Sequence, residues 1–181
     1  MLLLLLLQLL PLLNYAQFKS TTIGTTVTLE AGTRSSLRPG FGITAERRLT
    51  KHSGFETGLF YRSYKAGWIA TFTPGGLRTF NIIENYISVP VLYKYYTNVV
   101  NVSAGPCLDY FTGWNQTTGK PDIDVVDYTV HNKLQFGLQL KLSKAININK
   151  KISISPELRG TLNITNEMEY LGFGIAAGYK L

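Results

Sequence analysis

The chain has 181 residues and a net charge of +7 at pH 7, a length typical of one domain that can bury a core. A basic chain can bind nucleic acid or an anionic membrane surface, but the sequence has no zinc-finger spacing, no aromatic RNA-binding pattern and no basic helix. A membrane or cell envelope is therefore favoured over nucleic acid as the partner. The chain has a single cysteine, Cys107, so it cannot form an internal disulfide.

The chain opens with MLLLLLLQLLPLLNYAQ, an apolar run that ends in the small residue Ala16 just before Gln17. This run is too short to cross a bilayer as a helix and contains Pro11. Residues 1–17 are therefore predicted to be a cleaved secretory signal peptide, with a retained membrane anchor as the alternative. Residues 18–181 are predicted to form one exported domain.

Eight segments with strand periodicity follow, each bounded by turn residues. Most are about ten residues or longer, whereas strands of soluble sheets typically have about five or six residues. A tilted strand needs roughly nine to eleven residues to cross a bilayer. The predicted strands are residues 22–31, 40–49, 55–64, 85–96, 99–112, 133–143, 151–163 and 170–181.

The connections between these strands alternate in length. The second, fourth and sixth are short, at residues 50–54, 97–98 and 144–150. The first, third and fifth are longer and rich in Gly, Pro, Thr and Asp, at residues 32–39, 66–84 and 113–132. Short turns on one rim and long loops on the other are typical of transmembrane barrels, in which the short turns are periplasmic. We therefore predict an all-β fold, an eight-stranded antiparallel up-and-down transmembrane β-barrel.

One face of the predicted strands carries five acids and six bases, close to charge balance. Charges inside a narrow barrel must be paired, so this balance favours an interior position. Gly, Ser and Thr on the same face leave room for long charged side chains in an eight-stranded interior. The predicted lumen charge network consists of Glu30, Glu46, Arg48, Glu56, Arg62, Lys94, Asp109, Lys141, Glu157, Arg159 and Lys180.

The opposite face is apolar and has no charge near a strand centre. A charge at mid-bilayer would cost about 2–4 kcal/mol on a lipid-facing wall. Arg47 breaks the pattern, but it lies near the short-turn end, where its side chain can reach the interface. Candidates for interfacial aromatic belts are Tyr61, Trp68, Tyr93, Tyr95, Tyr110, Trp114 and Tyr179.

Two stretches carry a family resemblance: YISVPVLYKYY at residues 86–96 and the closing GFGIAAGYKL at residues 172–181. They resemble the small outer-membrane β-barrel family of the Bacteroidota, which includes PorT-like proteins. The resemblance implies a barrel of the cell outer membrane, inserted by the barrel-assembly machinery, and it implies no reaction. PorT-like members are associated with protein secretion and gliding.

Candidate sites for chemistry are few. His52 lies in a short turn, and His131 enters the sixth strand from a long loop, which is where some lipid-modifying barrel enzymes carry a histidine. Asp122, Asp124 and Asp127 offer oxygen ligands to a hard cation but lack the glycine and distal glutamate of a calcium loop. We therefore predict no enzyme activity, no cofactor and no metal.

The predicted function is that of an outer-membrane barrel with a plugged, charge-paired lumen and a structural, scaffold or surface-interaction role. Two alternatives remain open: a membrane-embedded lipid-modifying enzyme that uses His131, and a soluble periplasmic barrel that binds an apolar ligand. The expected partners are outer-membrane lipid and lipopolysaccharide, the latter bound by Arg34, Arg38 and Arg78. The long outer loops, above all the apolar residues 66–84, are further expected to meet another envelope protein.

Overall fold

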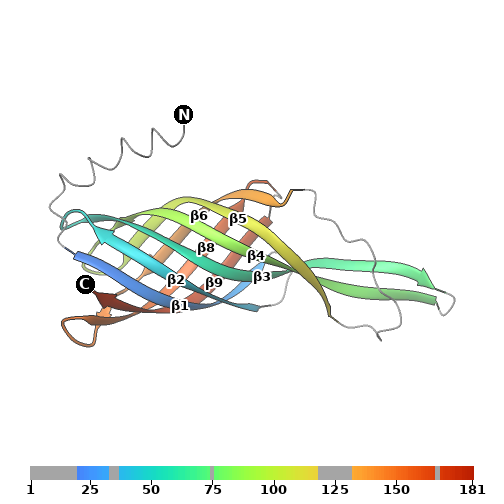
Figure 1. Ribbon diagram of the computed structural model, residues 1–181, viewed down its shortest axis with the longest axis horizontal. Coiled ribbons are helices and arrows are strands. Elements are labelled where there is room, and N and C mark those ends of the chain that lie inside the picture. The colour runs from blue at the N-terminus through green and yellow to red at the C-terminus, as the bar shows by residue number, and fades with distance from the viewer. Residues whose placement is uncertain (1–19, 33–36, 74–75, 118–131, 166–167) are drawn as a thin grey trace.

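The computed structural model describes residues 20–32, 37–73, 76–117, 132–165 and 168–181. The predicted signal peptide lies outside these residues. Nine strands are found in the described part of the chain (Figure 1). They are β1 (Ser20–Gly32), β2 (Arg38–Arg48), β3 (Ser53–Thr73), β4 (Gly76–Tyr95), β5 (Asn101–Thr117), β6 (Leu134–Ser143), β7 (Ile146–Asn147), β8 (Ile152–Asn163) and β9 (Met168–Lys180).

These strands close into a barrel. The strands β1 to β6 pair antiparallel with their neighbours in chain order, β6 pairs with β8, β8 with β9, and β9 returns to β1. The two-residue β7 pairs only with β8 among the described strands and lies in the β6–β8 connection, so the wall itself has eight strands. The predicted eight-stranded antiparallel barrel is confirmed.

The pairing of β1 with β9 removes the last sheet edge. It runs from Gly32↔Tyr170 to Thr22↔Lys180, and the amide of Leu181 donates a further hydrogen bond to the carbonyl of Thr21 at 2.9 Å. An open edge would leave backbone donors and acceptors unsatisfied in hydrocarbon, so only a closed sheet can span a membrane.

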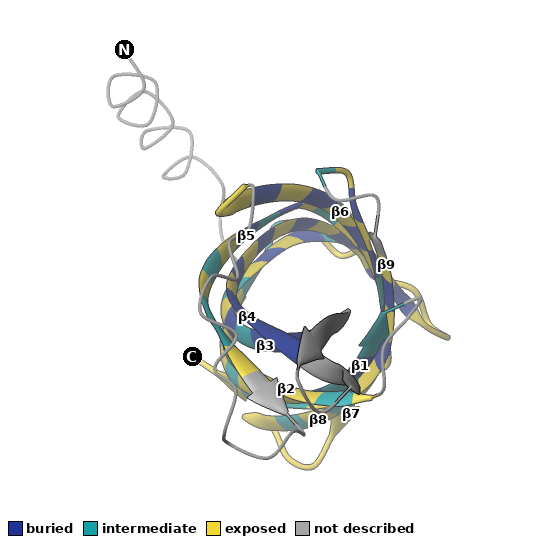
Figure 2. Cartoon of the chain, turned by 90° about the vertical axis from the view of Figure 1, so that its right-hand side faces the viewer, coloured by how far each residue is buried: buried dark blue, intermediate teal, exposed yellow. Residues whose placement is uncertain are grey.

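Side chains alternate between a polar inner face and an apolar outer face. On β6 the outward Leu138 is 51% exposed whereas the inward Gln139 is 4% exposed. Figure 2 shows the same alternation of buried and exposed bands around the wall. This arrangement contradicts the soluble barrel with an apolar ligand, because such a barrel needs an apolar interior.

Small residues on the inner face make room for larger ones. A Cβ on Gly172 would lie closer than 3.0 Å to Cγ of Glu30, and a Cβ on Gly42 would lie equally close to the ring of Phe60. Carbon atoms do not approach one another so closely, so glycine at these two positions lets a charged and an aromatic side chain lie against the wall.

The largest departure from the predicted elements is at residues 66–84, which the sequence predicts as a loop. There β3 and β4 continue as a paired hairpin as far as Thr73↔Gly76 and project beyond the barrel (Figure 1). A register shift between Lys65 and Gly67 marks the place where the hairpin leaves the wall. The loop prediction is wrong because the Thr, Ile and aromatic residues of this segment favour strands, and each strand satisfies the other's backbone.

Candidate functional site

The inner face of the barrel brings charged side chains of opposite sign together, beginning at Arg62 on β3. Its Nη2 lies 2.6 Å from Oε2 of Glu30 on β1, and its Nη1 lies 3.6 Å from Oδ1 of Asp109 on β5. The guanidinium also donates to the hydroxyls of Ser88 at 3.3 Å and Thr161 at 3.2 Å. Side chains of four other strands thus meet Arg62 in the lumen.

A second group continues from Glu30 toward the short-turn end. Nη1 of Arg159 lies 3.7 Å from Oε1 of Glu30, and its Nη2 donates to Oε2 of Glu157 at 2.9 Å. Nζ of Lys141 pairs with Glu157 at 3.2 Å and also with Glu56. These contacts alternate in sign from β1 to β8, β6 and β3.

The last group lies next to the short turns. Nζ of Lys94 lies 3.2 Å from Oε2 of Glu56 and pairs with Glu46. Tyr96, just past the end of β4, donates from its hydroxyl to Oε1 of Glu46 at 2.7 Å. Burial and the adjacent Glu46 carboxylate raise the pKa of Tyr96 above its ordinary value, so this phenol stays a neutral donor at physiological pH.

Eight ion pairs therefore join nine residues into one path along the lumen, which we call the ion-pair path. All of its members except Glu46 are buried. A buried ion that loses its partner costs about 3–5 kcal/mol, and every charge in the path has at least one partner. In order the path is Asp109, Arg62, Glu30, Arg159, Glu157, Lys141, Glu56, Lys94 and Glu46.

The other two residues of the predicted lumen network do not enter this path. Arg48 donates to the backbone carbonyls of Thr50 at 3.2 Å and Lys51 at 2.5 Å, and its guanidinium lies 4.3 Å from the ring centroid of Tyr96. Lys180 is exposed at the end of β9. Both lie at the short-turn rim, outside the ion-pair path.

A tyrosine cluster at the long-loop end was missed by the sequence analysis. Tyr64, Tyr86 and Tyr170 are at most 5% exposed, and the rings of Tyr64 and Tyr170 stack with centroids 3.9 Å apart. The hydroxyl of Tyr64 donates to Glu30 at 3.0 Å, and that of Tyr86 donates to Glu84 at 2.6 Å. These residues lie at or next to the ends of predicted strands, and the inward parity of those strands is the signal that locates them.

Two amides tie this cluster to β6 and β8. Nε2 of Gln135 donates to the hydroxyl of Tyr86 at 2.9 Å, and Nδ2 of Asn163 donates to Oε1 of Gln135 at 2.7 Å. The long-loop end of the lumen is therefore occupied by hydrogen-bonded side chains from β3, β4, β6 and β8, together with the stacked ring of Tyr170 from β9.

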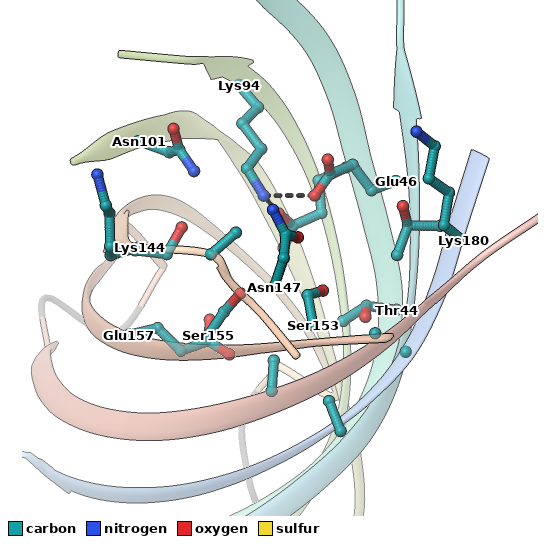
Figure 3. Close-up of a pocket in the computed structure, with 18 of the residues that line it drawn as sticks. Thr44, Glu46, Lys94, Asn101, Lys144, Asn147, Ser153, Ser155, Glu157 and Lys180 are labelled. Atoms are coloured by element: carbon teal, nitrogen blue, oxygen red, sulfur yellow. Dashed lines mark hydrogen bonds and ion pairs between the residues drawn. The ribbon is translucent and has the colours of Figure 1, made fainter. Parts of the chain in front are cut away.

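The short-turn end differs, because a cavity of about 330 Å³ opens there (Figure 3). Figure 3 shows Lys94 directed at Glu46 on one side and Ser153 and Ser155 on another, with Asn147 between them. The lumen is thus filled at one end and hollow at the other.

Within the described part of the chain, the residues considered for other chemistry are not assembled into a centre. Nδ1 of His52 lies 3.4 Å from the carbonyl oxygen of Tyr96, within the short turn. No group of three metal-ligating side chains occurs within the ranges that the structure describes. In the same ranges no helix is long and apolar enough to cross a membrane. The remaining candidates, His131, Asp122, Asp124, Asp127 and Arg34, lie outside the described residues.

The family model of the outer membrane protein beta-barrel domain matches residues 13–169. The chain belongs to this family. A search of curated proteins gave no match. The predicted location in the cell outer membrane is therefore confirmed. In barrels of the outer membrane the apolar wall faces lipid and the short turns are periplasmic, so we call the short-turn end of this barrel the periplasmic rim.

Solved outer-membrane barrels share this fold at low sequence identity. A major outer membrane protein from Thermus thermophilus is 12% identical, with a TM-score of 0.58, 90% of this chain covered and 98% of that one. OprG from Pseudomonas aeruginosa is 11% identical, with a TM-score of 0.57 and coverages of 91% and 97%. Neisserial surface protein A is 12% identical, with a TM-score of 0.52 and coverages of 89% and 97%.

Aromatic side chains gather on the outer wall near the periplasmic rim. Phe55 and Tyr93 form an edge-on pair with ring centroids 5.7 Å apart, and His52 stacks on Tyr95 at 6.2 Å. Phe55, Tyr93 and Tyr95 are each 48% exposed. Aromatic rings favour the membrane–water interface, so these residues fit an aromatic belt at the periplasmic surface of the membrane.

Proposed function

We propose that this outer-membrane barrel has a plugged, non-conducting lumen and serves as a membrane-anchored scaffold or surface-interaction protein. The observation that supports the plug is the ion-pair path, which joins all eight wall strands except β9 through their inward side chains. The tyrosine cluster adds β9 through Tyr170. An eight-stranded interior is just wide enough for side chains to fill it.

A passing ion would have to separate these pairs. Each separation leaves a buried charge without its partner, at a cost of about 3–5 kcal/mol. The stacked rings of Tyr64 and Tyr170 close the outer end above Arg62. Conduction therefore needs a rearrangement of several coupled side chains.

We expect the protein to show negligible conductance in planar bilayers. Insertion is checked in the same preparation by electrophoresis, because a folded barrel shifts in mobility when it is boiled. Stable channels from protein that shows this shift would contradict the plugged lumen. The absence of channels together with the absence of the shift would mean only that folding must be repeated.

The surface role is supported by the β3–β4 hairpin. Its pairing with β2 ends at Phe41↔Tyr61, and beyond this point β3 pairs only with β4 among the described strands. A free strand edge accepts an extended segment of another chain through backbone hydrogen bonds. The hairpin projects from the outer end of the barrel, where a partner can reach it (Figure 1).

Replacing residues 68–81 by Asn-Gly tests this role, because it removes the projecting hairpin at the pair Gly67↔Ile82 and leaves the wall intact. We expect the shortened protein to keep its mobility shift on boiling. Cells that carry it are expected to reproduce the phenotype of cells that lack the whole protein, including any loss of secreted protein. If cells with the shortened barrel were indistinguishable from cells with the native protein, the hairpin would have no role in surface interaction.

The secretion-associated, PorT-like role and the binding of lipopolysaccharide belong to the same proposal. The first is supported by the resemblance of residues 86–96 and 172–181 alone. The second is supported by the position of Arg38, at the start of β2 on the outer rim. The secretion-associated role is tested by measuring protein secretion in cells that lack the protein. Lipopolysaccharide binding is tested with a variant in which Arg34, Arg38 and Arg78 are replaced.

A further inference from the structure

The positive charge of the chain is concentrated at the periplasmic rim. The ion-pair path holds five acids and four bases, so the interior contributes no positive excess. The acid nearest the rim, Glu46, is already paired with Lys94. The bases of the described residues at this rim are Arg47, Arg48, Lys51, Lys144, Lys150, Lys151 and Lys180.

The cavity of about 330 Å³ opens at this same rim (Figure 3). Seven basic and three acidic side chains line it, an excess of four positive charges. All three acids belong to the ion-pair path, together with the basic Lys94 and Lys141. The volume falls in the range of small-molecule sites, roughly 300–1,000 Å³.

The cavity wall also offers hydrogen-bond donors. Thr26 is 2% exposed, and its hydroxyl has no hydrogen-bond partner among the described residues. A buried hydroxyl without a partner is unfavourable, so a ligand that accepts a hydrogen bond from Thr26 is stabilised. Ser153, Ser155 and Asn147 bring further hydroxyl and amide groups to the same space (Figure 3).

We propose that this cavity, the periplasmic vestibule, binds a phosphate group presented from the periplasmic side. An excess of four positive charges suits a dianion better than a monoanion. The lysine ammonium groups and hydroxyls of the cavity wall donate from several directions, so they can meet the several acceptor oxygens of a tetrahedral group. The polar wall excludes an apolar ligand, and the positive excess excludes a cation. The phosphate belongs either to a small soluble molecule such as a sugar phosphate or to the monoester headgroup of an inner-leaflet lipid such as phosphatidic acid.

Calorimetric titration of the full chain, folded in dodecylmaltoside, with glucose 6-phosphate tests the proposal. We expect saturable binding that weakens as salt is added, and no binding of uncharged glucose. The double variant Lys144→Gln, Lys180→Gln is expected to bind about tenfold more weakly. Thr26→Val, which keeps every charge, is expected to bind about threefold more weakly because it removes one donor.

Lys51→Gln is the matched control, because Lys51 lies at the same rim but does not line the vestibule. We expect its affinity to match that of the native chain. An equal loss of affinity in Lys51→Gln and in the double variant would mean diffuse attraction to the rim and would overturn the site. Binding of glucuronate as tight as that of glucose 6-phosphate would overturn the preference for phosphate, and the absence of saturable binding would overturn the whole proposal.

Two membrane compositions distinguish the sources of the phosphate. The protein is placed in phosphatidylcholine nanodiscs that contain either phosphatidylglycerol, an anionic phosphodiester, or phosphatidic acid, an anionic phosphomonoester, and glucose 6-phosphate is titrated into each. If the lipid headgroup enters the vestibule, phosphatidic acid weakens sugar-phosphate binding by the native chain and by Lys51→Gln more than phosphatidylglycerol does. If the natural ligand is soluble, the affinity is the same in both discs, and each result supports a phosphate site.

Discussion

Replacing Arg62 by alanine is expected to lower the free energy of unfolding of the barrel by about 3–5 kcal/mol. Arg62 is 3% exposed and lies within ion-pair distance of both Glu30 and Asp109, which are 3% and 2% exposed. Alanine leaves one carboxylate with Arg159 alone and the other with no cation among the described ion pairs. Urea unfolding in lipid vesicles, followed by tryptophan fluorescence, measures the change.

Lys51→Ala is the control for this experiment, because Lys51 is an exposed base in a periplasmic turn, outside the ion-pair path. We expect its unfolding curve to overlay that of the native chain. Adding Asp109→Asn to the Arg62→Ala variant removes the carboxylate that is left without a cation and is expected to restore part of the loss. If Arg62→Ala were as stable as Lys51→Ala, the ion-pair path would not contribute to the stability of the barrel.

The parity of the predicted strands indicated most of the charged residues that lie on the inner face, but not the buried Glu84, which the sequence analysis assigned to a loop. Side chains alternate with a period of two, so one correct assignment on a strand fixes the rest of that strand. Depth along the lumen does not follow from parity. Arg48 and Lys180 share the inward parity of Lys94 but lie at the open rim, and they make no ion pair among those that the structure describes.

Which residues pair with one another in the ion-pair path could not be predicted from the sequence either. Glu30 on β1 meets Arg62 on β3 and Arg159 on β8, and these strands are not its neighbours in the wall. Contacts across a lumen depend on the register of every strand that lies between the two residues. The alternation of side chains along one strand does not give these registers. The loop prediction for residues 66–84 was wrong because it relied on the Gly and Pro content of that segment. Pairing between β3 and β4 overrides this composition.

Leu138→Arg is expected to lower the free energy of unfolding in lipid vesicles by about 2–4 kcal/mol. Leu138 lies in the middle of β6, faces outward with 51% of its surface exposed, and is flanked in the wall by the outward Pro106 and Leu162. Neither of these neighbours can pair with a new charge. The arginine must either remain in hydrocarbon or distort the bilayer to reach water.

Leu142→Arg separates the effect of the membrane from the effect of the substitution. Leu142 is on the same face of the same strand and is 36% exposed, but it lies one residue from the end of β6 at the periplasmic rim. An arginine there reaches the interface with its own side chain, so its expected loss is only about 0–1 kcal/mol. Thinner lipids should narrow the gap between the two variants, since they shorten the distance from Leu138 to water. Equal losses at both positions, independent of lipid thickness, would mean that the apolar wall does not experience a membrane at all.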